Sequence, residues 1–320
     1  MTEFNKASEP DLQMDFTSQT VLYLGSKDFG LNVFKCLYSL SPQLKWTVCH
    51  PDDTKDERSA LGEFADFAKS HDIEMLTVRS PSESRELVIE LCPDVIFVCG
   101  WYWLLEKVEI LTPRLGVWGI HNSLLPKYRG GSPLVWAIIN GDENVGSSLF
   151  RFTEGMDDGP ILFQVILSVG HNDDIEEITA NLNELVIKCL PYYWGEIVNG
   201  SQIEIPQNHD EATYCGLRNE ADGRIDWSQD ASHIHNFIRA QSYPYPCAFT
   251  ELDGEKMKIY TSRRFHKTFF GTPGQVLSRS DDAVLVSCGH STAIFIEKVE
   301  FNGVVQSANE VICSIQKRLH

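Results

Sequence analysis

The segment Asp94-Val-Ile-Phe-Val-Cys99-Gly100 predicts a buried β-strand, because it is an unbroken apolar run that ends at a glycine. A second apolar run, Val21-Leu-Tyr-Leu24, ends at Gly25 and is followed by a helical pattern over residues 29–37. Between these two runs the same alternation continues, with strands expected at 46–49 and 73–78 and helices at 58–70 and 81–91. Alternating strands and helices predict an α/β fold, a Rossmann-like parallel sheet covered on both faces.

The pattern changes in the second half of the chain. A helix is expected at 132–140, strands at 147–153 and 161–169, and a long helix at 175–199, before a polar, proline-containing stretch at 202–210. Beyond it, one helix (231–240) is followed by short strands, and the turn Asp253-Gly254 predicts a hairpin between 248–252 and 257–260. With further strands expected at 274–277, 283–288 and 293–301, we predict a smaller, mostly β C-terminal domain built as an OB-like barrel. The expected divisions are a flexible tail (1–18), an N-terminal domain (19–205), a linker (206–213) and a C-terminal domain (214–320).

Composition excludes several classes of protein. The chain has 320 residues, 42% of them hydrophobic, and a formal net charge of −18, which makes nucleic acid an unlikely partner. We expect no membrane span, and the start Met1-Thr-Glu-Phe-Asn-Lys6 lacks the features of a signal peptide, which favours the cytoplasm. The cysteines number nine and form no close pairs, so we expect free thiols in a reducing compartment and no metal site.

The first strand-to-helix turn argues against a dinucleotide cofactor. Its sequence, Gly25-Ser-Lys-Asp-Phe-Gly30, is not the G-x-G-x-x-G pattern that cradles a pyrophosphate at a helix N-terminus. We therefore expect neither NAD nor FAD. Ligands of such sheets sit beyond the carboxyl ends of the strands, where the loops 100–105 and 123–131 are expected to gather.

Two short motifs bounded by glycines carry the chemistry. Gly119-Ile-His121 ends a strand-like run, and Gly155-Met-Asp157-Asp-Gly159 forms a tight turn at another expected strand end, 157 − 121 = 36 residues later. Taken alone, His121 is a structural histidine and Asp157 an ordinary Asp-Gly turn residue. Together, an imidazole that titrates near neutrality and a carboxylate that orients it are the groups required for general acid-base transfer of an acyl group to an amine.

The residues after the histidine suggest a binding surface. Ser123-Leu-Leu125 precedes Pro126, which keeps the peptide extended and its backbone free to hold the edge of a flat heterocycle. Lys127 and Arg129 are candidates to bind an anionic substrate tail, although an exposed basic pair usually faces water.

At this point the sequence resembles a known family. His121-Asn-Ser-Leu-Leu-Pro-Lys-Tyr-Arg-Gly130 and Gly155-Met-Asp-Asp-Gly-Pro160 are similar to motifs of the 10-formyltetrahydrofolate-dependent formyltransferases. The similarity includes 111–116, 212–216, 223–227 and the helix 233–240 through Pro246, and so spans most of residues 20–300. Within the family, the enzymes that formylate amino sugars on nucleotide carriers look closest.

The resemblance implies an enzyme that moves a formyl group from 10-formyltetrahydrofolate to a primary amine, most plausibly of a nucleotide-linked sugar. It implies His121 and Asp157 as the catalytic pair and 19–205 as the catalytic domain. The pterin is expected to lie against Trp101, Trp103, Leu104, Leu105, Ser123, Leu124, Leu125 and Met156. Substrate contacts are expected from Lys127, Arg129, Tyr214, Arg239 and Tyr243. Alternatively, Arg239 faces the other domain. An exposed edge of the barrel would permit a homodimer.

One position departs from the family pattern, which is Asn-x-His where this chain has Gly119-Ile-His121. The amide that would hold the formyl oxygen is absent, and loss of one such donor can cost on the order of 100-fold in turnover. Three interpretations remain open: Asn122 supplies a relocated donor, His121 acts alone, or the chain is an impaired homologue that only binds folate or sugar. Two further alternatives are a methionyl-tRNA formyltransferase, which the negative charge disfavours, and a noncatalytic binding protein.

Overall fold

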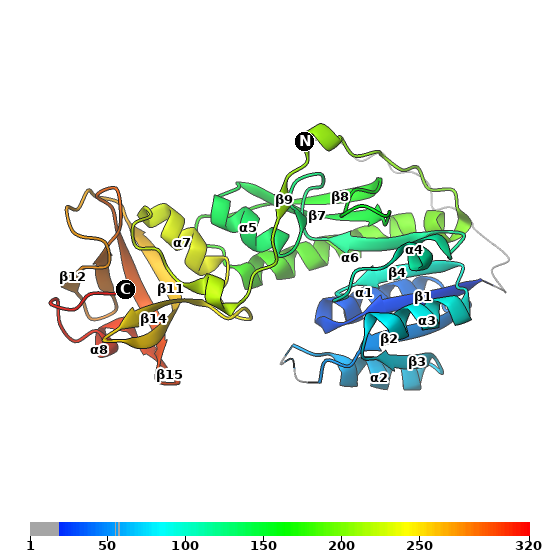
Figure 1. Cartoon of the computed structure of the whole chain (residues 1–320), viewed down its shortest axis with the longest axis horizontal. Coiled ribbons are helices and arrows are strands. Elements are labelled where there is room, and N and C mark those ends of the chain that lie inside the picture. Colours follow the sequence, from blue (N-terminus) through cyan, green and yellow to red (C-terminus); the bar gives the residue numbers. More distant parts are fainter. Residues whose placement is uncertain (1–18, 55, 57) are drawn as a thin grey trace.

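The computed structural model describes residues 19–54, 56 and 58–320, so the tail expected at 1–18 lies outside the described residues. The molecule is elongated, with a helix-covered sheet at one end and a smaller β-rich body at the other (Figure 1). Two separate apolar cores match these bodies, one built from residues between Val21 and Ala240 and the other from residues between Ile225 and Leu319.

The larger body contains a seven-stranded sheet in the order β3-β2-β1-β4-β5-β7-β8. Its strands are β1 (Thr20–Gly25), β2 (Lys45–Pro51), β3 (Glu74–Val78), β4 (Val95–Cys99), β5 (Val117–His121), β7 (Asn144–Arg151) and β8 (Ile161–Ser168). The first five are parallel, as predicted, whereas β7 and β8 are antiparallel to their neighbours. The predicted parallel sheet is thus confirmed, and β7 and β8, for which the sequence predicted no direction, extend it as an antiparallel edge.

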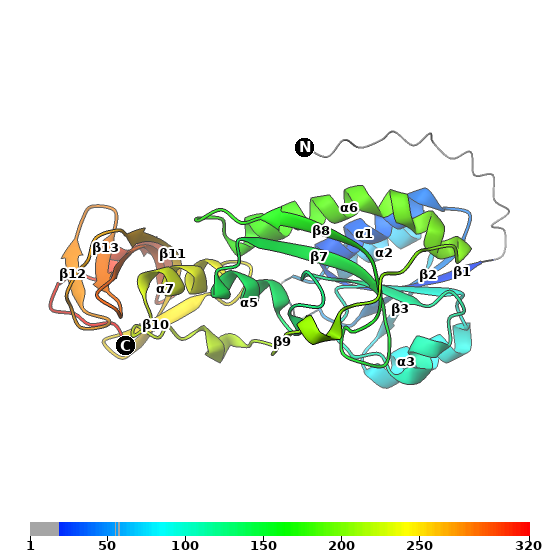
Figure 2. The same cartoon turned by 90° about the horizontal axis from the view of Figure 1, so that it is seen from above.

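Helices cover both faces of this sheet (Figure 2). They are α1 (Lys27–Leu40), α2 (Leu61–Ser70), α3 (Pro81–Leu91), α4 (Lys107–Leu111), α5 (Pro133–Asn140) and α6 (Ile175–Asn199). The apolar sides of α1, α2, α5 and α6 form the large core with odd-numbered residues of β1 and β4, while Val88 of α3 packs with a smaller cluster on the other face. Helix α2 begins three residues later than the sequence pattern suggested.

The smaller body is built around an antiparallel sheet, β10-β11-β14-β13-β12, with β15 paired to β14. Its strands are β10 (Ala248–Leu252), β11 (Glu255–Phe265), β12 (Val276–Arg279), β13 (Val284–Ser287), β14 (Ala293–Phe301) and β15 (Val304–Ser307), followed by α8 (Ala308–Val311). The hairpin at Asp253-Gly254 is confirmed. Isolated bridges join Leu319 to Leu252 and Arg318 to Gln275, so the C-terminus spans both outer strands. An OB-like barrel stays an interpretation of this topology.

Helix α7 (Ala231–Arg239) joins the two bodies. Its buried residues Ala231, Ile234 and Ile238 pack in the smaller core, and the helix also contacts α5 of the larger body (Figure 2). His235 contacts both sides, because its Nε2 donates to the His171 carbonyl and its Nδ1 lies 3.0 Å from the Ser262 hydroxyl. Two short 3₁₀ helices (His209–Glu211 and Glu220–Gly223) and the two-residue pair β6 (Arg129–Gly130) and β9 (Tyr214–Cys215) complete the connection.

Candidate active site

The predicted site lies where β1, β4 and β5 end. The chain runs from β1 outward to β3 and then returns to β4 on the other side of β1, so the strand order reverses between β1 and β4. Open α/β sheets bind ligands beyond the carboxyl ends of their strands at such a point. The loops after Cys99 and His121 both start there.

His121 is the last residue of β5, and its side chain is 11% exposed. Its Nε2 lies 2.8 Å from the Tyr128 carbonyl oxygen. A carbonyl oxygen can only accept, so Nε2 carries a proton and donates it. The second nitrogen, Nδ1, is therefore where the ring gains or loses a proton, and it faces Asp157.

Asp157 is the second residue of the predicted pair. Together with His121 it forms what we call the corner of the site. Its Oδ2 lies 3.7 Å from Nδ1 of His121 and accepts a hydrogen bond of 2.8 Å from the backbone N–H of Gly130. The residue has a positive φ of 48°, which turns the chain so that Asp157 points to the histidine while Asp158 bonds to Thr153. The structure thus brings together the imidazole and the carboxylate that the two motifs predicted to meet.

A buried clamp holds the Asp157 turn in place. Gln207 donates from Nε2 to the carbonyl oxygens of Asp157 and Gly159, at 2.8 and 2.6 Å. Its Oε1 accepts from Nη2 and Nε of Arg129, at 2.6 and 3.1 Å. Gln207 was not singled out by sequence reasoning, since nothing local marks a glutamine in a polar connection as the support of a turn 50 residues away.

The buried position of Arg129 changes its interpretation. Its side chain is 1% exposed, and the guanidinium also contacts Tyr214 and His209. Every contact made by this group is therefore with the protein beneath the site, which corrects the expectation that Arg129 faces a substrate. Lys127 is exposed and Tyr214 is 65% exposed, so both are open to solvent nearby.

The expected linker also belongs to this corner. Thr213 accepts from the backbone N–H of Arg129 and of Tyr128, through its carbonyl and its hydroxyl. Strand β9 then pairs in parallel with β6, in the segment that follows His121. The 206–213 segment is thus part of the wall of the site as well as a connection between bodies.

Asn122 lies away from the His121–Asp157 pair. Its Oδ1 accepts from the Ser147 hydroxyl at 2.9 Å, and the residue lines a small cavity with Lys127, Tyr128 and Gly146. Successive side chains of a strand point to opposite faces, which is why Asn122 does not stand beside His121. The structure therefore does not place its amide where a relocated donor is needed.

The segment after the histidine is anchored from below. Ser123 is buried, and its carbonyl accepts from the Ser148 hydroxyl at 2.6 Å. Ser148 also accepts from the backbone N–H of Leu125 and from Gln164, which in turn donates to the Leu125 carbonyl. Leu125 is 3% exposed and packs with Phe150 and Ile161, whereas Leu124 is half-buried. The predicted pterin surface is thus rigid on this side.

Gly119 lies on the same face of β5 as His121, and the ring of Phe152 fills the space beside it. A Cβ built on Gly119 would stand 2.5 and 2.8 Å from Cε1 and Cζ of Phe152. Phe152 stacks on Phe150 with ring centroids 4.9 Å apart and packs against the apolar cluster that contains Val98 and Val117. The space that a side chain at position 119 would need is therefore occupied by the ring of Phe152.

The loop after β4 carries the other predicted pterin residues. Trp101, Trp103 and Leu105 are half-buried against the same cluster as Phe152, and the two indoles meet edge to face at 5.3 Å. Leu104 is 86% exposed and Met156, on the Asp157 turn, is 54% exposed. This loop thus combines a packed side with large apolar side chains that nothing in the described chain covers.

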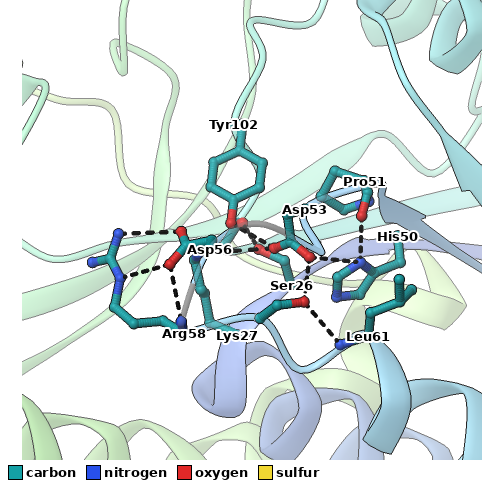
Figure 3. Close-up of polar contacts among 11 residues, drawn as sticks. Ser26, Lys27, His50, Pro51, Asp53, Asp56, Arg58, Leu61 and Tyr102 are labelled. Atoms are coloured by element: carbon teal, nitrogen blue, oxygen red, sulfur yellow. Dashed lines mark hydrogen bonds and ion pairs between the residues drawn. The ribbon is translucent and has the colours of Figure 1, made fainter. Parts of the chain in front are cut away.

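A polar cluster fixes the start of that loop (Figure 3). The Ser26 hydroxyl donates to the Gly100 carbonyl, and the Tyr102 hydroxyl donates to Asp53 Oδ2 at 2.7 Å. Lys27 lies 4.7 Å above the Tyr102 ring and pairs with Asp56. Burial acts to raise the pKa of Asp56, but Lys27 and Arg58 outweigh it and hold that pKa well below its usual range. The hydrogen bonds and ion pairs of this cluster connect the segments that follow β1, β2 and β4.

Two predicted substrate residues lie at the joint between the bodies. Arg239 is 8% exposed and donates to the carbonyl oxygens of Gly170 and Asp173, so it faces the larger body, as the alternative interpretation held. Tyr243 is 62% exposed on the segment after α7. Neither contacts the His121 corner in the bonds described.

Cys215 lies near Asp157, and burial together with that carboxylate raises the pKa of its thiol to about 11, so the thiol is protonated near neutrality. Within 19–54, 56 and 58–320, no group of three or more His, Cys, Asp or Glu is arranged to hold a metal ion. In the same part of the chain, none of the helices has the length and apolarity needed to cross a membrane.

Comparison with family models gives two matches. Residues 46–192 match the model described as "Formyl transferase", and residues 218–316 match "Formyl transferase, C-terminal domain". The first range contains the His121 and Asp157 motifs, and the second begins just after β9.

Individual relatives agree. The chain is 30% identical over 288 residues to a methionyl-tRNA formyltransferase of Alkaliphilus oremlandii, covering 88% of this chain and 92% of the relative. Among solved structures, the fold is similar to WlaRD, a sugar 3N-formyl transferase with dTDP and 5-N-formyl-THF (TM-score 0.65, 19% identity, 87% of this chain and 97% of that one). It is also similar to an N-formyltransferase from Helicobacter canadensis in complex with folinic acid and dTDP-3-aminofucose (TM-score 0.67, 19% identity, 87% and 99%).

Proposed function

Because this chain belongs to the formyltransferase family, we propose that it transfers a formyl group from 10-formyltetrahydrofolate to the primary amine of a nucleotide-linked amino sugar. The observation that carries the proposal is the pairing of His121 and Asp157 at the carboxyl end of β5, 3.7 Å apart. Solved relatives of the same fold contain a formyl-folate, which supports a folate co-substrate.

The reaction joins the amine nitrogen to the formyl carbon and breaks the bond between that carbon and N10 of the folate. The attacking nitrogen loses one proton, and N10 gains one as tetrahydrofolate leaves. Nδ1 of His121, which faces Asp157 while Nε2 donates to the Tyr128 carbonyl, is the group that would carry this proton. Asp157 sets the orientation of the ring and stabilises its charged form, and Gly130 and Gln207 keep the carboxylate in position.

Charge favours a sugar over a tRNA as the amine substrate. The chain carries 45 acidic and 27 basic residues, and binding to a phosphate backbone needs several unpaired basic residues on one face. At the carboxyl edge of the sheet, Lys27 and Arg58 are already paired with Asp56. A nucleotide sugar requires far fewer cationic contacts, and exposed Lys127 lies close to the corner.

A methionyl-tRNA substrate remains the second candidate for a specific reason. The relative with 30% identity over 288 residues is named for that activity, and the chain covers 92% of it. We place it second because of the acidic surface, and the same assay distinguishes the two substrates.

The test is formyl transfer by the full chain. Purified protein would be mixed with 10-formyltetrahydrofolate and either dTDP-3-amino-3,6-dideoxyhexose or methionyl-tRNA, and the release of tetrahydrofolate followed by absorbance. Turnover with the sugar nucleotide and not with the tRNA is expected. Turnover with the tRNA alone would overturn the choice of substrate, and folate binding without turnover of either would support the impaired homologue.

A further inference from the structure

We propose that the indole N–H of Trp101 is the side-chain hydrogen-bond donor to the oxygen of the formyl group while it is transferred. This inference rests on the function proposed above and assigns one atom of the chain to the step. It begins from a requirement of the chemistry. When an amine adds to a formyl carbon, negative charge develops on the formyl oxygen, and a preorganised donor aimed at that oxygen lowers the barrier.

The nearest position that could hold such a donor has none. On the face of β5 that carries His121, the preceding side-chain position is Gly119, and the Phe152 ring occupies its space. Nε2 of His121 already donates to the Tyr128 carbonyl, and Asn122 points away toward Ser147. A side-chain donor that replaces the absent amide is therefore to be sought on another element at the same edge of the sheet.

The loop after β4 is the adjacent element. Strand β4 pairs with β5 in parallel, with Val98 opposite Gly119, so the residues just beyond Val98 extend past the same end of the sheet as His121. Trp101 lies three residues beyond Val98 and packs against the same apolar cluster as Phe152. The residues on both sides of Trp101 are anchored, because the Gly100 carbonyl accepts from the Ser26 hydroxyl. The Tyr102 hydroxyl donates to Asp53 (Figure 3).

The indole nitrogen of Trp101 has an unusual environment, which indicates a ligand. Its Nε1 is buried and has no hydrogen-bond partner in the protein. Leaving such a donor unpaired costs about 1–3 kcal/mol. By contrast, the indole nitrogens of Trp46, Trp118, Trp194 and Trp227 each donate to a named protein oxygen. An unpaired donor on a ring that packs edge to face against Trp103, with anchored residues on both sides, is suited to an acceptor that arrives with the substrate.

The test uses Trp101→Phe, which removes the N–H and keeps an aromatic ring. Because the lost donor has no partner, we expect the melting temperature of the free protein to be unchanged or higher. Turnover should fall on the order of 100-fold while KM for the amine changes little, since the bond is made to the formyl oxygen of the folate and strengthens as negative charge develops there. The matched control is Trp227→Phe in the smaller core, which removes a paired N–H and should lower the melting temperature and leave turnover unchanged.

Binding gives a second readout that needs no amine. The probes are 5,8-dideazafolate and its 10-formyl derivative, which differ only in the formyl group. The wild-type protein should prefer the formyl compound, and Trp101→Phe should lose that preference. An active wild type whose Trp101→Phe variant keeps both its turnover and its preference would overturn the role of Trp101 alone. A wild type that binds neither probe and releases no tetrahydrofolate would overturn the proposed function itself.

Discussion

Two loops leave the same edge of the sheet and are built in opposite ways. In the corner around His121 and Asp157, each polar group discussed above has a protein partner: the imidazole has Tyr128, the carboxylate has Gly130, and the turn has Gln207. In the loop 100–105, one indole nitrogen has no partner, and Leu104 and Tyr102 are largely or partly open to solvent. One region is complete without a ligand, whereas the other lacks contacts that a ligand can supply.

The difference assigns separate tasks to the two regions. A corner whose hydrogen bonds are already made holds its reacting groups in one geometry, which contributes to rate through orientation. A loop with exposed apolar surface and an unpaired donor is stabilised when a ligand covers that surface and accepts the hydrogen bond. Changes in the corner should therefore affect turnover and stability, and changes in the loop should affect ligand binding and turnover.

The largest expected effect is the loss of the catalytic pair. His121→Ala should lower formyl transfer by about 100- to 10,000-fold, because it removes the group that carries the proton. Asp157→Asn should act in the same direction, since the carboxylate that orients and charges the ring is lost. Both variants are to be compared by tetrahydrofolate release and by thermal melting. His266→Ala, an exposed histidine of the smaller body, is the control, and wild-type turnover in His121→Ala would rule out the mechanism.

The next effect concerns the clamp under the corner. Gln207→Leu leaves the buried guanidinium of Arg129 without its main acceptor and two carbonyls without a donor. The free energy of unfolding, measured with urea, should fall by about 1–3 kcal/mol or more. Turnover should fall as well, because the Asp157 turn is no longer fixed. Gln316→Leu changes an exposed glutamine in the same way and should alter neither property. A stable, fully active Gln207→Leu protein would show that the corner does not depend on this clamp.

The comparison also explains what the sequence could and could not predict. Apolar runs and helical periods located β1 to β5, α3 and α6 well, because these signals are local. The meeting of His121 and Asp157 followed from two turns at strand ends. The burial of Arg129, the role of Gln207 and the position of Phe152 depend on contacts between distant segments, which no local pattern records. The antiparallel pairing of β7 was missed for the same reason.

A smaller effect tests the packing that separates the corner from the loop. Gly119→Ala places a methyl group against the Phe152 ring and should cost about 1–3 kcal/mol of stability. In a Phe152→Ala background the same change should cost much less. In a double-mutant cycle, the two changes together should therefore cost less stability than the sum of their separate costs. Gly62→Ala is the matched control, since a Cβ there meets nothing within 4 Å inside α2, and it should stabilise by about 0.5–1 kcal/mol. Equal costs of Gly119→Ala in both backgrounds would mean that Phe152 does not define this space.

The smallest effect lies outside both loops, at the joint between the bodies. Burial lowers the pKa of His235 below its ordinary value of 6.5, so the native protein keeps this ring neutral. The unfolded chain gains a proton as the pH falls through 6.5, whereas the folded chain does so only at lower pH. The contribution of His235 is therefore fully present above pH 6.5, declines below it, and levels off once the pH is under the native pKa. His235→Gln should flatten this decline in urea melts between pH 7 and 5, where buried His50 supplies a residual slope of the same sign.

The bonds of His235 reach His171 and Ser262 and not the corner, so formyl transfer at neutral pH should change far less than in the corner variants. An equal loss would show that the two bodies act on the site together.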